Sequence, residues 1–387
     1  MNLLHVSDVY FPRINGVSTS IRGSARELRR RGHHVDLLVP HYGGEAAEEH
    51  VIRVHSNPVP FDPEDRLMDP RRAHAAAARL DRRPPDLVHV HTPFVAQAVG
   101  RRVARRFEVP TVVTVHTHFE DYLHCYVPLL PRPLLRRVAR SFYLRQARSA
   151  SALLAPSRAI SDLLAEYGVR ARVEVIPTGV PLEEIRGGDG EAFRRRMGIE
   201  PDRKVLVHVG RMAHEKNVGF LIEVLAVVRR FLPDVLLLLA GDGPALSSLR
   251  RQVVELGVDR NVRFVGYLDR ERELLDCYRA GDVFVFASRT ETQGLVLLEA
   301  MALEVPVLST AVLGTRDVVG PGRGAVVVEE NVAAFAAQAL MLLENPALRR
   351  RLGRDGRRFV EEEWSDRATV SRTLDLYGEL VLQRRAA

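Results

Sequence analysis

Short apolar runs alternate with amphipathic stretches along the whole chain, and this alternation limits the fold more than any other feature. Brief apolar runs bounded by turn residues are typical of buried strands, and strands that alternate with helices form parallel sheets. The first half predicts strands near residues 2–6, 35–39, 51–54, 87–91, 111–115, 152–155 and 173–176. The second half repeats the pattern near 205–209, 235–240, 262–265, 283–287, 306–309 and 325–328. We therefore expect an α/β protein with two doubly wound, Rossmann-like sheets.

The length of the chain also favours two domains, because 387 residues are too many for one ordinary core. Pro177 and Pro181 bracket a glycine between the two sets of strands, which predicts a linker there. A second boundary is expected near Trp364. The predicted organisation is an N-terminal domain of residues 1–178, a C-terminal domain of residues 179–363 and a final helical segment, 364–387.

Two glutamates, Glu291 and Glu299, follow the predicted strand at 283–287 and are separated by seven residues. An apolar helical pattern begins just after Gly294, so Glu291 is expected on a loop and Glu299 one turn into a helix. A turn residue and a solvated helix residue are the common interpretation of such a pair. Their position after a strand instead predicts a ligand site, because ligands bind at the carboxyl ends of strands in open α/β sheets.

Two cations occupy the loop after the predicted strand at 205–209. Arg211 follows Gly210 directly, and Lys216 stands just before an apolar helix. Two cations beside the free N–H groups of a helix start form a site for a diphosphate. Lys216 and Lys204 are the only lysines beside 54 arginines. Lys216 therefore indicates that the predicted site needs a compact ammonium group. A single lysine can also occur at such a position by chance.

The first half of the chain offers two further loops. Gly16 lies between the strand at 2–6 and an amphipathic helix at 18–31, where a glycine lets the backbone approach a ligand closely. This loop lacks the glycine spacing of the dinucleotide-binding fingerprint. His116 and His118 follow a later strand and suggest a metal, but no third ligand is evident in the sequence. A catalytic or hydroxyl-binding role for His118 is therefore preferred, and no metal is expected.

Together these motifs resemble the retaining glycosyltransferases of family 4, which have the two-domain GT-B fold. The resemblance covers essentially the whole chain, and its motifs stand in family order: Asn15-Gly16, His116-Thr117-His118, Pro156-Ser157, residues 176–180, Gly210-Arg211 with Lys216, residues 240–244 and the two glutamates. One departure is the loop Thr292-Gln293-Gly294, where the family commonly has Gly-Phe-Gly. With residues 118–122, this variant is similar to the branch that glucosylates diacylglycerol.

The resemblance implies two domains facing across a cleft, with the last helix, 366–383, returning to the N-terminal domain. The N-terminal domain is expected to bind the acceptor and the C-terminal domain the nucleotide sugar. The implied reaction transfers a hexose, glucose from UDP-glucose, to a membrane lipid hydroxyl such as that of 1,2-diacylglycerol. The anomeric configuration is expected to be retained, the departing phosphate taking the acceptor's proton, and no cofactor is required beside the donor substrate.

The resemblance also implies a role for each site residue. Arg211 and Lys216 should bind the donor diphosphate and stabilise the charge of the departing nucleotide. Glu299 should accept hydrogen bonds from the ribose and Glu291 from the sugar. The remaining expected contacts are His118 with the sugar near the reacting carbon, Gly16 with the phosphates, the backbone of Gly294, Leu295 and Val296 with sugar or phosphate, and the backbone of Leu268 with the base.

Positive charge is concentrated in the first half of the chain. Residues 1–180 hold 26 arginines and 18 acidic residues, net +8, whereas the remainder has a net charge of −1. Six of these arginines lie in residues 131–148, and on a helix Leu134, Leu135, Val138 and Phe142 share one face. This pattern predicts a helix that lies on an anionic membrane surface. The alternative is a solvated helix that packs its apolar stripe on the core; a nucleic-acid partner is not expected.

The location of the protein follows from three expectations. Cys125 and Cys277 fall in different halves and form no disulfide framework, which favours a reducing cytoplasm. The N-terminus has no basic region ahead of an apolar one, as a signal peptide would. No apolar stretch is long enough to span a bilayer. A peripheral protein on the inner face of the cell membrane is therefore expected.

Two other functions stay open. The donor could be GDP-mannose, with another lipid or a small polar molecule as acceptor. The chain could instead be an inactive sugar-nucleotide-binding protein, although the joint presence of Arg211, Lys216, Glu291 and Glu299 argues against a decayed site. The sequence carries no signal of oligomeric state.

Overall fold

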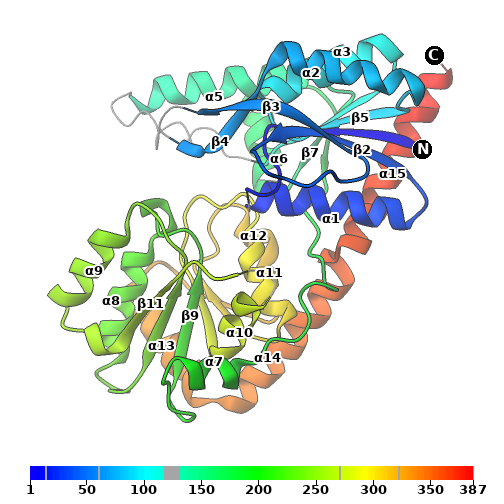
Figure 1. The fold of residues 1–387 in the computed structure, drawn as a ribbon. Coiled ribbons are helices and arrows are strands. Elements are labelled where there is room, and N and C mark those ends of the chain that lie inside the picture. Colours follow the sequence, from blue (N-terminus) through cyan, green and yellow to red (C-terminus); the bar gives the residue numbers. More distant parts are fainter. Residues whose placement is uncertain (14, 60–61, 117–130, 270–271, 321–322, 387) are drawn as a thin grey trace. The chain divides into compact units, whose positions relative to one another are not determined.

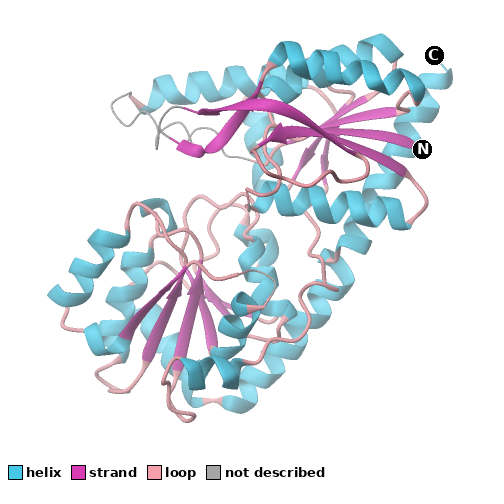
Figure 2. Ribbon diagram, viewed as in Figure 1, coloured by secondary structure: helices cyan, strands magenta, loops and turns pink. Residues whose placement is uncertain are grey.

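The computed structural model describes residues 1–13, 15–59, 62–116, 131–269, 272–320 and 323–386. The chain divides into two compact units (Figure 1). The first unit comprises Met1–Gly179 with Asp366–Ala387, and the second comprises Val180–Ser365. In each unit, helices cover both faces of a central sheet (Figure 2).

The described residues of the first unit form an eight-stranded sheet with the order β4-β3-β2-β1-β5-β6-β7-β8. Its neighbouring strands are parallel except for the antiparallel pair β3 and β4. The strands are β1 (Asn2–Val6), β2 (His34–His41), β3 (Val51–Val59), β4 (Asp62–Met68), β5 (Leu87–Val90), β6 (Thr111–Thr114), β7 (Ala152–Ala155) and β8 (Val173–Val175).

Two layers of helices bury this sheet. One layer consists of α1 (Gly16–Arg30) and α15 (Asp366–Ala386), which share a core cluster that includes Ile21, Leu28 and Tyr377. The other layer consists of α2 (Pro70–Ala77), η1 (Ala78–Arg82), α3 (Val95–Phe107), α5 (Arg132–Ala147) and α6 (Arg158–Glu166). The C-terminal helix therefore belongs to the first unit, because its apolar face completes a core made by the N-terminal strands.

The second unit has a six-stranded, fully parallel sheet within its described residues, with the order β11-β10-β9-β12-β13-β14. The strands are β9 (Val205–Val209), β10 (Leu236–Ala240), β11 (Val262–Gly266), β12 (Val283–Phe286), β13 (Val307–Ser309) and β14 (Ala325–Val327). The helices are α7 (Gly190–Arg196), η2 (His214–Lys216), α8 (Val218–Val228), α9 (Leu246–Glu255), η3 (Asp259–Asn261), α10 (Glu273–Ala280), α11 (Leu295–Ala302), α12 (Thr315–Val318), α13 (Val332–Glu344), α14 (Pro346–Phe359) and the π-helical turn η4 (Val360–Trp364).

Each sheet reverses its strand order at one place, which is where a crevice opens at the carboxyl ends of the strands. In the first unit β1 lies between β2 and β5, and in the second unit β9 lies between β10 and β12. The loops that follow β9 and β12 therefore flank the crevice of the second unit, and these loops carry the cations and the first glutamate.

The sequence analysis failed to predict one strand and underestimated the length of another. β3 continues to Val59, beyond the predicted 51–54, and pairs with β4, which was not predicted. The β4 sequence, DPEDRLM, contains a proline and four charged residues and so lacks the apolar pattern of a buried strand. β4 lies at the edge of the sheet, where proline and charge are tolerated.

The apolar face predicted for the arginine-rich helix is wrong in one respect. On α5, Leu135, Ala139 and Tyr143 are buried, the last two in the core cluster that covers the sheet, whereas Leu134 is 45% exposed. Leu134 and Leu135 therefore lie on different faces of the helix. The buried residues of α5 recur at every fourth position, which places them on one face of the helix. The neighbouring elements determine which face is buried, and the local sequence pattern does not show where those elements lie.

Candidate functional site

The β9 loop (residues 210–217) and the β12 loop (residues 287–294) meet at the crevice of the second unit. The Arg289 N–H donates a hydrogen bond to the Glu215 carbonyl at 3.3 Å, and the Ser288 hydroxyl donates to the same oxygen at 3.4 Å. The two loops are thus joined through their backbones, which holds the side chains at their ends close together.

Lys216 and Glu291 form an ion pair across these loops. The Lys216 ammonium donates to the Glu291 Oε1, and each side chain is about one-fifth exposed. The sequence assigned these two residues to different groups of one ligand, and the structure brings them into direct contact. An arriving diphosphate would compete with Glu291 for the ammonium group.

Arg211 and Gly210 begin the β9 loop. Arg211 is exposed and has no ion pair among the described residues. The backbone beside it is held by the end of β10: the Gly210 N–H donates to the Ala240 carbonyl at 3.0 Å. A Cβ on Gly241, whose φ is +127°, would lie 2.0 Å from the Gly210 oxygen. A glycine is therefore required at 241 so that the backbone carrying Arg211 can pack this closely.

Gly294, Leu295 and Val296 form the start of α11. Gly294 has a φ of +87°, which a glycine adopts without strain, and it precedes the first helical residue. The backbone N–H groups of a first helical turn have no intrahelical acceptor. This turn therefore presents N–H groups and the positive end of the helix dipole next to the Lys216–Glu291 pair.

Glu299 is buried in α11, so the interpretation as a solvated helix residue is wrong. Its side chain is only 4% exposed, and its Oε2 accepts a hydrogen bond of 2.8 Å from the hydroxyl of Tyr278 on α10. A buried carboxylate held by a buried tyrosine is costly to maintain without a function. The sequence does not identify Tyr278, because no local motif connects α10 with α11.

Gly314 is a second residue that the sequence missed. Its N–H donates to the Glu291 carbonyl at 2.9 Å, and a Cβ on it would lie 1.9 Å from the Thr292 carbonyl oxygen. Gly314 thus packs against the backbone of the β12 loop and holds it by a hydrogen bond. A glycine in a loop that follows a strand, here β13, at the same edge of the sheet is the signal that could have identified it.

The other predicted site residues lie elsewhere. Leu268 follows β11, and its side chain is buried in the core, which leaves its backbone as the part that can face a ligand. Gly16 is exposed at the start of α1 in the first unit. His118 lies outside the described residues.

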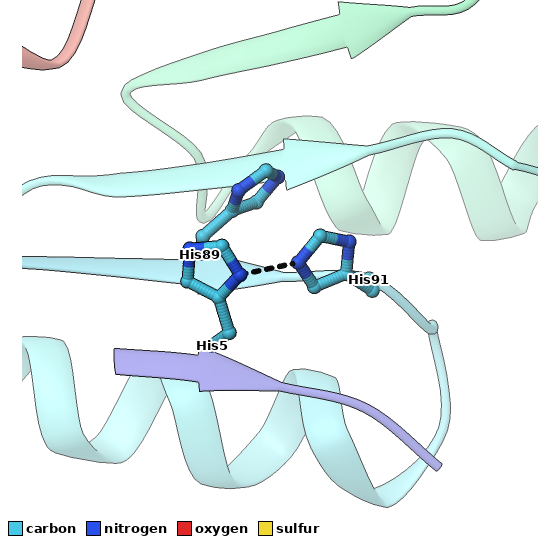
Figure 3. A group of neighbouring side chains, drawn as sticks. All are labelled: His5, His89 and His91. Atoms are coloured by element: carbon cyan, nitrogen blue, oxygen red, sulfur yellow. Dashed lines mark hydrogen bonds between the residues drawn. The ribbon is translucent and has the colours of Figure 1, made fainter. Parts of the chain in front are cut away.

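The crevice of the first unit contains a group of buried histidines that only the tertiary structure assembles. His5 on β1 contacts His91 beyond β5, with 3.1 Å between Nδ1 and Nε2, and His89 lies beside them (Figure 3). The Nδ1 of His91 is 3.1 Å from the Nε2 of His116. The sequence showed no third ligand near His116, whereas nitrogens of His5, His89 and His91 all lie within 4.8 Å of one another.

These histidines are neutral, and each makes at least one hydrogen bond, although the buried Nε2 of His5 has no partner among the described residues. Burial lowers the pKa of His5 to about 3 and that of His116 to about 4, and it holds the pKa of His89 and His91 well below the usual value. The two nitrogens of His89 contact the hydroxyls of Thr114 and Tyr377, at 2.6 and 2.5 Å. A metal ion bound by His89 would have to displace these bonds, and the described residues hold the group together as a network of neutral histidines.

Comparison with known proteins identifies the family. A model described as "Glycosyltransferase Family 4" matches residues 14–184, and one described as "Glycosyl transferases group 1" matches residues 189–359. An alpha-monoglucosyldiacylglycerol synthase of Streptococcus pneumoniae is 33% identical over 312 residues, which cover 78% of this chain and 69% of that protein. The chain belongs to glycosyltransferase family 4.

Other relatives of this family 4 glycosyltransferase have different names. The alpha-monoglucosyldiacylglycerol synthase of Acholeplasma laidlawii is 27% identical over 312 residues, 78% of each chain. A GDP-mannose-dependent alpha-mannosyltransferase of Mycobacterium tuberculosis is 30% identical over 328 residues, covering 82% of this chain and 81% of that one. The chain is thus similar to enzymes whose names refer to different sugars.

Solved structures show that this glycosyltransferase has the GT-B fold. The UDP complex of Anabaena HepE superposes with a TM-score of 0.76 at 20% identity, covering 98% of this chain and 100% of that one. Sucrose-phosphate synthase from Thermosynechococcus elongatus gives a TM-score of 0.77 at 21% identity, over 99% and 100% of the two chains. In the part of the chain that the structure describes, no helix is both long and apolar enough to cross a membrane.

Proposed function

We propose that this glycosyltransferase transfers glucose from UDP-glucose to the hydroxyl of 1,2-diacylglycerol with retention of the anomeric configuration. The observation that carries the proposal is the Lys216–Glu291 pair at the crevice of the second unit, beside Arg211 and the first turn of α11. This arrangement offers cations and N–H groups to a diphosphate and a carboxylate to a sugar. The names of the two diacylglycerol-glucosylating relatives support the choice of donor and acceptor.

In the proposed reaction, the bond between the anomeric carbon and the donor phosphate breaks while the acceptor oxygen bonds to the same face of that carbon. The departing phosphate oxygen takes the proton of the acceptor hydroxyl. Negative charge grows on the diphosphate as the bond breaks, so Arg211 and Lys216 stabilise the transition state more than the bound donor. Glu291 keeps the ammonium of Lys216 in place before the donor binds and then accepts hydrogen bonds from sugar hydroxyls.

The direct test is consumption of a panel of nucleotide sugars with and without vesicles that contain diacylglycerol. UDP-glucose is expected to be consumed fastest, and the vesicles should raise its rate of consumption by providing the acceptor. Preferred use of GDP-mannose would instead support the mannosyltransferase alternative, which the Mycobacterium tuberculosis relative favours. No consumption of any donor, with UDP still bound, would indicate an inactive binding protein.

Replacing each of the two glutamates by alanine is expected to affect UDP binding and sugar transfer differently. Glu299→Ala should weaken binding of free UDP, because we propose that this buried carboxylate accepts hydrogen bonds from the ribose. Glu291→Ala should spare UDP binding and lower sugar transfer, since UDP has no sugar for Glu291 to contact. Calorimetry with UDP and an assay of transfer measure both effects. The exposed Glu255 on α9 provides a control, Glu255→Ala, which should change neither.

Equal losses of UDP affinity in both glutamate variants would contradict the assigned roles. Because Glu299→Ala also removes the acceptor of the Tyr278 hydroxyl, Glu299→Gln is the second variant. Its amide oxygen can still accept that bond. A folded Glu299→Gln protein with weakened UDP binding would therefore show a contact with the ligand, not a defect of folding.

We also propose that α5 brings the enzyme to an anionic membrane, where its lipid acceptor lies. The exposed Leu134 and the arginines around it support this role. Two of these arginines also bind the protein itself: Arg136 contacts Glu166, and Arg140 donates to the Tyr167 carbonyl at 2.8 Å. Arg137 has no ion pair among the described residues.

Replacing Arg136, Arg137 and Arg140 together by glutamine is expected to weaken binding to anionic vesicles by about a hundredfold, since each arginine near the lipid contributes about 1 kcal/mol. The effect should shrink in high salt, because the Debye length is about 8 Å at physiological ionic strength. Co-sedimentation with vesicles measures it, and Glu166→Gln controls for loss of the ion pair of Arg136. Equal sedimentation of wild type and the triple variant would make α5 an ordinary solvated helix.

A further inference from the structure

Three metal-ligating side chains meet where β2 and β3 begin in the first unit. His34 and Asp36 stand two positions apart on β2 and therefore project from the same face of that strand. His50 directly precedes β3, which pairs with β2 in parallel (Figure 1), and its carbonyl accepts a hydrogen bond of 2.8 Å from the Leu37 N–H. One ligand atom of each of the three side chains lies within 4.8 Å of the other two, and none of these side chains is more than 30% exposed.

The distances within this cluster fit one small ion. The Oδ1 of Asp36 is 3.2 Å from the Nε2 of His34 and 3.5 Å from the Nδ1 of His50. Ligand atoms that surround a zinc ion as a tetrahedron, each about 2.0–2.1 Å from the metal, are about 3.3 Å from one another. The two imidazole rings are nearly perpendicular, with 4.5 Å between their centroids, so they approach the same carboxylate oxygen from different directions. Two imidazoles and one carboxylate are a ligand set that zinc accepts.

His50 also has the outer contact that metal-bound histidines usually make. Its Nε2 is 3.2 Å from the Oε1 of Glu49, and a carboxylate accepts a hydrogen bond from a protonated ring nitrogen. A proton on Nε2 leaves the lone pair of Nδ1 directed toward Asp36. A lone pair and a carboxylate repel each other unless a proton or a metal ion lies between them.

The backbone of His50 is a second unusual feature. Its φ is +63°, in the left-handed region that residues other than glycine seldom adopt. Such conformations occur mostly where the surrounding structure or a function requires them. Here the left-handed turn brings the ring of His50 next to Asp36.

Arg83 opposes the binding of a cation at this place. Its Nη1 is 2.6 Å from the Nδ1 of His34 and 3.1 Å from the Nε2. A guanidinium group is always charged and can only donate, so the Nδ1 of His34 is the acceptor and the Nε2 carries the proton. A metal ion must therefore displace this proton and the charge of Arg83. Arg83 is exposed, so its side chain can turn into solvent.

We propose that His34, Asp36 and His50 bind one divalent transition-metal ion of the zinc class, which ties the start of β2 to the start of β3. The ligand atoms are the Nε2 of His34, the Oδ1 of Asp36 and the Nδ1 of His50, and water completes the coordination. The site lies at the amino-terminal edge of the sheet, whereas substrates of doubly wound sheets bind at the carboxyl-terminal edge. The ion is therefore structural and takes no part in the proposed glycosyl transfer.

The test measures metal binding by the full chain, prepared without a histidine tag and freed of metal with a chelator. Calorimetry is expected to show one Zn²⁺ bound per chain, and Mg²⁺, which prefers oxygen ligands, should not bind. Zn²⁺ should raise the melting temperature, because the ion binds the folded chain and the unfolded chain does not hold the three ligands together. Co²⁺ in place of Zn²⁺ should give the visible absorption of a site with few ligands.

Variants at the ligands have matched controls. His34→Gln and His50→Gln should each lower the zinc affinity at least about tenfold, because each removes a ligand. His55→Gln removes an exposed histidine from β3 and should leave the affinity unchanged. Arg83→Ala should raise the affinity about tenfold, because it removes a positive charge beside the ion. Arg82→Ala, at the neighbouring exposed position, should not.

The gain expected for Arg83→Ala keeps the test valid if a ligand variant fails to fold, which circular dichroism and melting without zinc would reveal. Absence of saturable zinc binding by the wild type would overturn the proposal, and so would an unchanged affinity in Arg83→Ala. Zinc binding that persists in His34→Gln and His50→Gln but is lost in His91→Gln would assign the ion to the buried histidines and also overturn it. These measurements need no nucleotide sugar, so their failure would leave the proposed glycosyl transfer untouched.

Discussion

Replacing Lys216 by alanine is expected to lower the turnover of glycosyl transfer by about 10²–10³-fold. We propose that its ammonium contacts the donor diphosphate, and this contact strengthens as negative charge grows on the departing nucleotide. The structure adds a second cause. Without Lys216, the carboxylate of Glu291 loses its cation and would repel the diphosphate. Turnover and KM measured with the preferred donor should therefore both change, turnover more strongly.

The other lysine of the chain is a matched control. Lys204→Ala removes the same charge from the same unit, just before β9 and thus at the opposite edge of the sheet from the β9 loop. It should leave turnover nearly unchanged. Lys216→Arg should recover only part of the activity, since a planar guanidinium does not fit where a compact ammonium does. A folded Lys216→Ala protein with turnover within a factor of three of wild type would remove Lys216 from the site.

The first unit is expected to lose stability steeply below pH 6.5, at about 3–4 kcal/mol per pH unit. His5, His89, His91 and His116 stay neutral in the folded unit because burial lowers the pKa of each, whereas in the unfolded chain they titrate near pH 6.5. The unfolded state then binds more protons. The contribution of these neutral histidines to the free energy of unfolding is complete above pH 6.5. It is lost as the pH falls toward the pKa values that the histidines have in the folded unit.

Two carboxyl groups oppose this loss. Burial raises the pKa of Asp8 to about 6 and also raises that of Asp366, so the folded unit binds protons there before the unfolded chain does. These groups reduce the slope below about pH 6. The second unit has one comparable histidine among its described residues, His208, whose pKa burial lowers to about 4. The free energy of unfolding of the second unit is therefore expected to fall by about 1.4 kcal/mol per pH unit.

Hydrogen exchange detected by mass spectrometry can compare the two units in one sample. Opening free energies of peptides from β1 and β5 should fall faster between pH 7 and pH 5.5 than those of peptides from β9 and β10. His116→Gln keeps a side-chain group that can bond to His91 and removes one titrating histidine, so it should lower the slope of the first unit. His55→Gln, at an exposed position, should not. Equal pH dependence in both units would contradict the assigned cause.

The sequence alone determined the fold class, the family and the order of the site motifs. Buried parallel strands need apolar runs, and loops at their carboxyl ends need glycine and polar residues, so both leave local patterns. The alternation of strands and helices therefore indicated two Rossmann-like sheets. The same kind of pattern placed Lys216 and Glu291 on loops after strands, without showing that these loops are neighbours.

The tertiary structure alone decided which of these residues meet. Strand order brings β9 beside β12, and this order joins Lys216 to Glu291 although 75 positions separate them. It also buries Glu299 against Tyr278 and assembles the four histidines of the first unit. The edge strand β4 and the buried face of α5 were missed for the same reason. Local periodicity reports which side of an element is apolar, whereas the neighbour that covers that side depends on chain crossings that no short segment encodes.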